Sequence, residues 1–358
     1  MCTKFFAYTN LTILKQKVFF MKSASTWSAL CAFSLISAGV YADVRPKNLE
    51  IDRHWSVLAE YVFMERSHVD NRRIVKDSSD LRCVDGCPST VVISSKNLVN
   101  DFGYTSGGRI GLSYKPDTKS IYQTRFMYIT PWTASKTVHG NDTLSFPFHT
   151  DTFTEDYNYA EKAKAHLTSQ FYTFDLNYWR NSARRGIDYF VVSGVFGIRF
   201  FHLQEKLNLA FYNDTVEGTT KSNYNAKTQN DSIGIQGGFN LQMNPYKHLS
   251  FDFLALGGLG LNRAYEDVFL GDVNNTVIIR EFTKQNGTSV VFADTALQVG
   301  YQFVPCMNMH IGYQLFYACG QALAPQQLSF SVNPLNERFI DTGYVIIHGL
   351  LVGFNFDF

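Results

Sequence analysis

The sequence predicts an all-β protein: a single transmembrane antiparallel up-and-down β-barrel of about ten strands, with long extracellular loops and short periplasmic turns. Apolar and polar residues alternate with period two along most of the chain. The runs are joined by short turns and by long polar segments, which succeed each other along the chain. The chain also ends in the alternating run YVIIHGLLVGFNFDF, although the last residues of a soluble domain usually fray.

Ten segments carry the alternation and are the expected strands. In one of them, Ile233 and Ile235 fall on one face while Gln236 falls on the other. The ten segments are 54–66, 107–115, 119–132, 167–180, 188–202, 231–243, 249–261, 291–303, 309–317 and 344–358.

The connections between these segments alternate in length. Tight turns follow every second strand, with the sequences KPDTK, NSARRG, NPYKH and VPCMN. One stretch of the long segments, AEKAKAH at 160–166, reads as one or two helical turns. The long polar segments are roughly 67–106, 133–166, 203–230, 263–289 and 321–342. Short connections on one side and long ones on the other are the layout of bacterial outer-membrane barrels.

The composition of the two strand faces separates a membrane barrel from a secreted sandwich or a lipocalin-like barrel, which also alternate. The polar face is rich in Gly, Ser, Gln and Asn with single charges. The apolar face carries rings near strand ends, which suit a membrane interface: Trp55, Tyr114, Tyr122, Trp132, Tyr178, Tyr301 and Tyr317. We therefore expect the apolar face to contact lipid and the polar face to enclose the interior.

The N-terminal segment predicts export by a signal peptide. An apolar stretch ends in small residues with the spacing that signal peptidase requires. We expect translation to start at Met21 and cleavage to follow Ala42, which leaves a presequence of 1–42 and a barrel domain of 43–358. A lipoprotein site at Cys31 fits less well, because the leucine expected three residues earlier is missing. No run of about 18 apolar residues follows, so we expect no transmembrane helix.

The C-terminal residues predict a lipid-facing closing strand that pairs with the first strand. Phe354, Phe356 and Phe358 share one face of this run and resemble the signal that the barrel-insertion machinery of diderm bacteria reads. The alternative is a soluble edge strand that ends in phenylalanine by chance.

Charge and cysteine content exclude some classes. The net charge of +1 argues against a nucleic-acid partner, which would require a basic face. In an oxidising compartment, Cys83 and Cys87 of CVDGC are expected to form a small disulfide loop. A zinc pair fits less well, because no second ligand pair follows at suitable spacing. Cys306 and Cys319 are too far apart along the chain to pair with each other. We expect no metal and no cofactor.

Polar residues on the inward face are the candidate site. Arg109, Arg125 and Arg199 could form a basic constriction that favours anions or small solutes. Alternatively, they crosslink the interior, which the small lumen of a barrel of about eight to ten strands favours. Asp252 and Asp294 could select cations or pair with these arginines. The candidate lumen-lining residues are Glu60, Arg109, Arg125, Asp175, Arg199, Asp252, Asp294, Gln298 and Gln314, and the same inward positions include Arg66 and His310.

Several stretches together resemble a known family. They are HWSVLAEYVFMERS, SQFYTFDLNYWR, GVFGIRFFHLQEKLNL, NDSIGIQGGFNL, LQVGYQFVPCMNMHIGYQLFYACGQALAPQQL and HGLLVGFNFDF. In order, they resemble the planctomycete and chlamydia-related outer-membrane β-barrel proteins catalogued as the seventh β-barrel protein family. A looser likeness is to the legionella-type pore-forming major outer-membrane proteins. After GYQLFY the family pattern has a tryptophan, whereas this chain has Ala318 and Cys319. The resemblance implies location and fold, but no chemistry.

Catalysis is not expected. The second long segment contains a cluster of His149, Asp151, Glu155 and Asp156. It lacks the strand-borne aspartates and Asp-x-His element of outer-membrane proteases, and the chain contains neither Gly-x-Ser-x-Gly nor His-Glu-x-x-His.

The expected function is a narrow porin-like channel for passive diffusion of small polar solutes across the bacterial outer membrane. The alternative is a non-conducting structural barrel or a surface adhesin that acts through its extracellular loops. The expected partners are outer-membrane lipid and lipopolysaccharide, the barrel-insertion machinery and the small polar solutes.

Overall fold

The computed structural model describes ten segments of the chain. The expected presequence, the Cys83–Cys87 pair and the cluster around His149 lie outside them. The described residues are 54–67, 71–78, 89–117, 119–146, 160–181, 189–213, 220–246, 248–271, 278–328 and 340–358.

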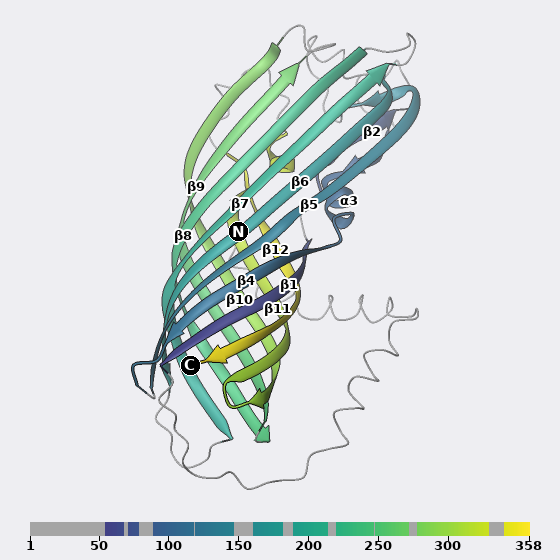
Figure 1. Ribbon diagram of the computed structural model, residues 1–358. Coiled ribbons are helices and arrows are strands. Elements are labelled where there is room, and N and C mark those ends of the chain that lie inside the picture. Colours follow the sequence, from purple (N-terminus) through teal and green to yellow (C-terminus); the bar gives the residue numbers. More distant parts are fainter. Residues whose placement is uncertain are drawn as a thin grey trace, which may run out of the picture. The chain divides into compact units, whose positions relative to one another are not determined.

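Within the described residues, ten antiparallel strands close into a barrel (Figure 1). Each strand pairs with its neighbours, and β12 pairs with β1 from Ser56–Asp357 to Ser67–Ile346. The prediction of a closed antiparallel ten-strand barrel is confirmed. The strands are β1 (Trp55–Ser67), β4 (Tyr104–Tyr114), β5 (Ser120–Ser145), β6 (Ala160–Asn181), β7 (Phe190–Asn213), β8 (Thr220–Tyr246), β9 (Leu249–Gly271), β10 (Ile278–Val304), β11 (Met307–Ala322) and β12 (Thr342–Asp357).

The strands are strongly tilted. A row of paired residues that leaves β1 at Ser67 and crosses every strand returns to β1 at Trp55, twelve residues away along the strand. With a rise of about 3.3 Å per residue and about 4.8 Å between strands, this stagger gives a tilt of about 40°. A ten-strand barrel of this kind is narrow enough for side chains from opposite walls to meet.

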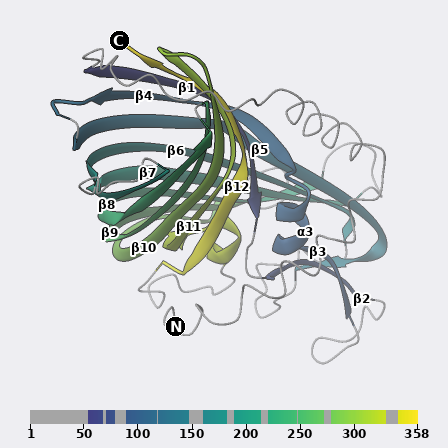
Figure 2. The ribbon, with the colours of Figure 1, turned by 90° about the horizontal axis from the view of Figure 1, so that it is seen from below.

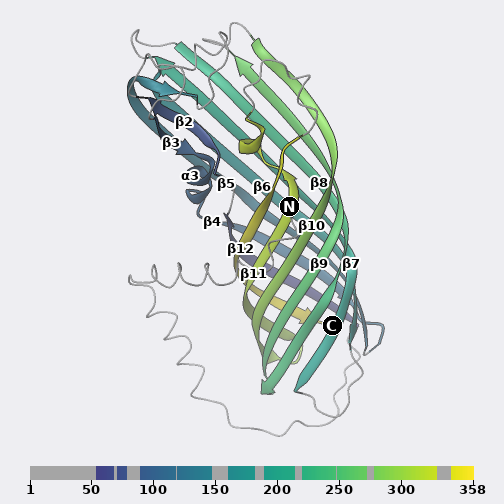
Figure 3. The ribbon, with the colours of Figure 1, turned by 180° about the vertical axis from the view of Figure 1, so that it is seen from behind.

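Six consecutive strands are much longer than a membrane requires. β5 to β10 contain 26, 22, 24, 27, 23 and 27 residues, whereas a tilted strand crosses a bilayer in about 9–11. Figure 3 shows these strands rising together beyond the ends of β1 and β4. The expected loops 133–166, 203–230 and 263–289 are therefore wrong over most of their length, because their residues extend the barrel.

The polarity of the wall inverts along these strands, which explains the error. On β7, Arg199 points inward and Phe196 outward, but further along the strand Leu203, Leu207 and Leu209 are buried inside while Lys206 is exposed. Period two continues while the two faces exchange character. The expected helical turns at 160–166 are wrong for the same reason, since this stretch belongs to β6.

Trp132 corrects the expected ring of lipid-facing aromatics. It is only 1% exposed, and its Nε1 donates to the carbonyl oxygen of Met64 at 3.0 Å. The register of β5 against β6 shifts between Ile129 and Trp132. This irregularity moves Trp132 to the inner face, because one extra residue exchanges the faces of a strand.

A small side structure extends the sheet at one end of β5. β2 (Arg73–Ser78) pairs with β5 at Lys76–Ser145 and with β3 (Ser89–Ser94) on its other side. Helix α3 (Ser95–Asn100) follows β3, and the Ser94 side chain caps it by accepting from the Asn97 N–H. Figure 2 shows α3 and β3 beside β5. Apolar residues of this unit join the core cluster of the barrel interior, among them Ile74, Ile93 and Leu98.

The closing strand has the expected faces. Phe354, Phe356 and Phe358 are exposed on the outer wall. Trp55 and Phe358 exchange two backbone hydrogen bonds, of 3.0 and 2.9 Å. The described residues contain no helix that is both long and apolar enough to cross a membrane.

Candidate functional site: the closed interior of the barrel

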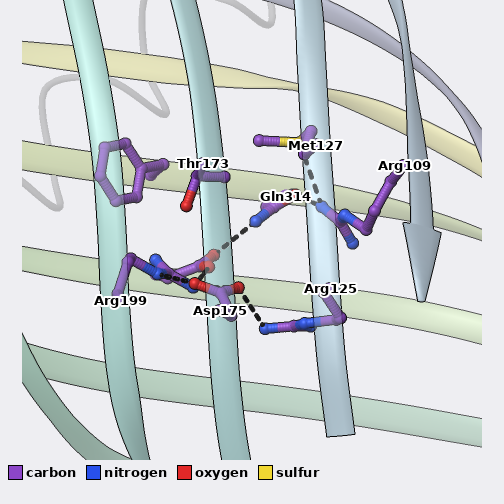
Figure 4. A pocket seen from close by; sticks show the side chains of 9 residues that line it. Arg109, Arg125, Met127, Thr173, Asp175, Arg199 and Gln314 are labelled. Carbon is purple, nitrogen blue, oxygen red and sulfur yellow. Dashed lines mark hydrogen bonds and ion pairs between the residues drawn. The ribbon is translucent and has the colours of Figure 1, made fainter. Parts of the chain in front are cut away.

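The centre of the barrel contains a network of buried charges. Arg199 binds two acids: its Nε donates to Asp175 Oδ1 at 2.6 Å and its Nη2 to Asp294 Oδ2 at 2.7 Å (Figure 4). Arg125 Nη2 donates to Asp175 Oδ2 at 3.1 Å. Asp175 on β6 therefore joins arginines of both neighbouring strands, β5 and β7.

A second set of contacts extends this network across the lumen. Arg109 Nη1 lies 2.9 Å from Glu60 Oε2, and Glu60 Oε1 lies 2.6 Å from His310 Nε2. Arg109 Nη2 also donates to Gln314 Oε1, and Gln314 Nε2 donates to Asp294 Oδ1 at 2.7 Å. We call these eight residues the interior network: Glu60, Arg109, Arg125, Asp175, Arg199, Asp294, His310 and Gln314.

The interior network compensates its own charge. Three guanidinium groups face three carboxylates, and all six side chains are buried. A buried charge is tolerated when it is paired and hydrogen-bonded. The arrangement therefore requires no bound ion to hold it together.

Aromatic rings cover one side of the network. The Arg199 guanidinium carbon lies 5.7 Å from the centre of the Phe292 ring and 5.5 Å from that of Phe316, within cation–π range. Gly234 and Gly258 make room for Phe292, because a methyl group at either position would overlap its ring. A cavity of about 10 Å³, which is about the space of one water molecule, lies between the network and these rings.

A second buried ion pair lies beyond these rings. Arg66 and Glu205 form a salt bridge with both side chains 0% exposed. Glu205 also accepts from Ser169 Oγ at 3.2 Å and from the Ala324 N–H at 3.1 Å. The Arg66 guanidinium lies 5.5 Å from the centre of the Phe102 ring.

The Ala324 contact ties a short 3₁₀ helix, η4 (Ala324–Gln327), to the inner wall. All four of its residues are buried, and it contacts β7 and β8. Two buried asparagines hold the chain leading into it: Asn230 binds both backbone groups of Ala322 at 2.7 and 2.8 Å, and Asn262 Nδ2 donates to the Gly320 oxygen at 2.9 Å. Gly320 has a φ of 83°, which glycine adopts without strain. The chain after β11 therefore folds into the barrel and adds to its filling.

The nine predicted lumen-lining residues fall into two groups by position. Seven are buried and belong to the interior network, whereas Asp252 and Gln298 are half-buried outside it. These two are register partners on β9 and β10, and Asp252 accepts from Ser250 Oγ at 3.2 Å rather than from an arginine. Asp294 does pair with Arg199.

The sequence reading missed Glu205, the asparagine contacts and η4. Glu205 falls within the expected loop 203–230, although it shares inward parity with Leu203 and Leu207 in the sequence FHLQEKLNL. That continued alternation was the signal for it. In the part of the chain that the structure describes, no group of three or more potential metal ligands is present. The expectations of no catalysis and no cofactor stay predictions.

Comparisons with known proteins give only distant likenesses. No family model and no curated protein matches the chain. The outer-membrane protease OmpT of Escherichia coli is similar in structure, with a TM-score of 0.43 and 8% identity over 87% of this chain and 99% of that one. The translocator domain of the autotransporter NalP from Neisseria meningitidis has a TM-score of 0.35 and 7% identity over 93% and 96% of the two chains. OprG from Pseudomonas aeruginosa has a TM-score of 0.25 and 12% identity over 86% and 96%.

These values are too low to support an argument about function. The class of the protein follows from its own geometry: the chain is an outer-membrane β-barrel, because its barrel is closed and its apolar side chains cover the outer wall around a filled interior. The resemblance to the seventh β-barrel protein family stays a prediction.

Proposed function

We propose that the protein is a non-conducting barrel of the bacterial outer membrane that acts as a structural or surface-binding protein through its extracellular extension. The observation that carries this proposal is the interior network. Its six charged side chains compensate one another, and several of them line a cavity of about 10 Å³. A channel needs a continuous polar path wider than one water molecule.

The length of β5 to β10 supports the same proposal. Beyond the apolar band these strands remain paired, enclose an apolar core and present polar residues outward. Such an extension is a rigid support for contacts at the cell surface.

A narrow channel is the second candidate, and one observation favours it. Asp252, Gln298 and Asn308 are only half-buried in the part of the lumen near the β10–β11 turn, so this part is polar and partly open. Small polar solutes entering there would cross only if the interior network opened.

Planar-bilayer conductance of refolded protein tests the two functions. We expect a silent bilayer for the wild type, with folding verified by the heat-dependent shift in electrophoretic mobility. The double variant R109A/R125A removes two side chains that fill the lumen, so it is expected to give small discrete steps and shows that the assay detects an open barrel. Discrete steps from the wild type, with currents that change when small polar solutes are added, would overturn the proposal.

Surface binding is tested by shortening the extension. Lys136 and Ala165 are paired on β5 and β6, so joining them through an Asn-Gly turn in place of 137–164 preserves the register below the cut. We expect bacteria with this variant to bind host cells or neighbouring bacteria less well than bacteria with equal amounts of the wild-type barrel. Unchanged binding would leave a purely structural role as the function.

A further inference from the structure

The outer wall of the long strands changes abruptly from apolar to charged where the membrane band ends. On β8 and β9 the last strongly exposed apolar residues are Ile233 and Leu261, 55% and 71% exposed. The next outward residues are Asp231 and Arg263, which are partners in the register. On β7, His202 lies in the same row and its Nδ1 is 2.6 Å from Asp231 Oδ1.

Two further rows of polar side chains lie directly beyond this boundary. In the first, hydrogen-bonding side chains succeed one another across five adjacent strands: Gln170, Gln204, Gln229, Tyr265 and Gln285. In the second, two lysines stand side by side between hydroxyl and acidic residues: Thr168, Lys206, Lys227, Asp267 and Thr283. We call the three rows together the outer platform.

The charges of the outer platform point to an anionic partner. Lys206 and Lys227 are exposed and directly opposite each other in the β7–β8 register, an arrangement that is unfavourable unless an anion lies between them. Asp267 is the register partner of Lys227 on the other side, and its Oδ1 accepts from Thr283 Oγ1 at 3.4 Å. One carboxylate compensates one of the two lysines.

The amide row narrows the chemistry of that partner. Glutamine side chains both donate and accept hydrogen bonds, as sugar hydroxyls do, whereas lysine ammonium groups bind phosphate. The apolar wall immediately below would contact acyl chains. Outward from this wall the glutamine row comes before the lysines. A phosphorylated glycolipid of the outer leaflet presents matching groups, with acyl chains joined to a sugar backbone and phosphates carried on its sugars.

We propose that the outer platform on β6–β10 is a binding site for lipopolysaccharide, with Lys206 and Lys227 on phosphate and the row of glutamines on sugar. The proposal rests on the membrane orientation in which the long strands extend outside the cell. It does not depend on whether the lumen conducts.

The test uses the refolded protein in zwitterionic detergent and fluorescently labelled rough-type lipopolysaccharide, with affinity measured by fluorescence anisotropy. We expect the double variant K206Q/K227Q to bind about thirty-fold more weakly, since each lysine near an anionic surface contributes a factor of about five. The matched control K115Q/K119Q removes the same charge in and beside the β4–β5 turn, and its affinity is expected to equal that of the wild type.

Two further arms separate the possible ligands. Lipopolysaccharide stripped of its phosphates is expected to bind the wild type as weakly as intact lipopolysaccharide binds K206Q/K227Q. Q204A/Q229A is expected to lose affinity for lipopolysaccharide while its weaker binding to phosphatidylglycerol in mixed micelles stays unchanged.

Three results would overturn the proposal: wild-type affinity in K206Q/K227Q, equal affinity for intact and dephosphorylated lipopolysaccharide, or equal affinity for lipopolysaccharide and phosphatidylglycerol. The conductance experiment tests only whether the lumen is open, so failure of the proposed function and failure of lipopolysaccharide binding are distinguishable. Each variant is compared only after its heat-dependent mobility shift shows a folded barrel.

Discussion

At the scale of single residues, the interior tolerates very little added volume. Gly257 and Gly258 are consecutive on β9 but face opposite sides of the wall. A methyl group on Gly258 would overlap the Phe292 ring and the backbone oxygen of Ile235, whereas one on Gly257 would have nothing within 4 Å.

We therefore expect Gly258→Ala to lower the free energy of unfolding by about 1–3 kcal/mol, as overpacking of a tight core does. Gly257→Ala is the matched control and should change stability little. Urea titration of the barrel in detergent, followed by tryptophan fluorescence, measures both. Equal stability of the two variants would mean that Phe292 does not fill the centre of the barrel.

The Arg66–Glu205 pair gives a second prediction at this scale. Both side chains are fully buried, so removing one partner leaves the other charge uncompensated. Arg66→Met or Glu205→Leu alone should destabilise the barrel by about 3–5 kcal/mol.

The double variant R66M/E205L should recover most of that loss, because an apolar pair of similar volume needs no partner. The same urea titration measures the three variants as a double-mutant cycle. Additive losses in the double variant would show that the two residues act independently.

At the scale of strands, the alternation of polar and apolar residues predicts where the strands lie better than it predicts how long they are. All ten barrel strands and most inward positions follow from period two, because successive side chains of a strand point to opposite faces. The outer parts of β5 to β10 do not follow from the same pattern, because the prediction assumes that the apolar face points outward along the whole strand. On β7 the inward residues change from Arg199 to Leu203 and Leu207, so a stretch with an apolar interior was read as a polar loop.

The interior network illustrates the same limit. The inward parity of Arg199 and Asp294 could be read from the sequence, and so could the near balance of charge. Their pairing could not, because the two residues lie 95 positions apart and meet only when the stagger of the strands is known. Trp132 was misplaced because nothing in its local sequence fixes the irregularity of β5.

The closing strand carries a prediction about assembly. Phe358 is 64% exposed, and its contribution to the β1–β12 seam is made by backbone groups paired with Trp55. Phe358→Ala should therefore refold into detergent with almost unchanged stability. If the terminal ring is an insertion signal, the same variant should yield much less folded barrel in cells.

Comparison of the heat-shifted band in outer-membrane fractions with the same band after refolding separates the two effects. Leu350→Ala is a suitable control, since it also removes an exposed apolar side chain from the outer face of β12. Equal amounts of folded barrel in cells for the wild type and Phe358→Ala would contradict the insertion signal.

At the scale of the whole barrel, two solvents act on one continuous wall. At the level of β1 and β12 the outer surface is apolar and the interior is charged. In the parts of β6 to β10 that extend beyond β1 and β4, the outer surface is polar and the interior is apolar. The inversion marks the membrane boundary, because an apolar outer wall is favourable only against hydrocarbon. The extension is then a curved sheet of β5 to β10, with an apolar inner face and a polar outer face, that continues one side of the membrane barrel.

This boundary predicts a sharp step in accessibility. In a chain whose Cys83, Cys87, Cys306 and Cys319 are all replaced by serine, a single cysteine at Leu261 should resist a membrane-impermeant maleimide on intact cells, while one at Gln285 should react. The two positions lie on neighbouring strands and both face outward, so they differ mainly in depth. Unfolding in detergent and urea should make both react fully, which controls for intrinsic reactivity. Equal labelling of Leu261→Cys and Gln285→Cys on intact cells would show that the apolar band is not in the membrane, and the outer platform would then lose its proposed partner.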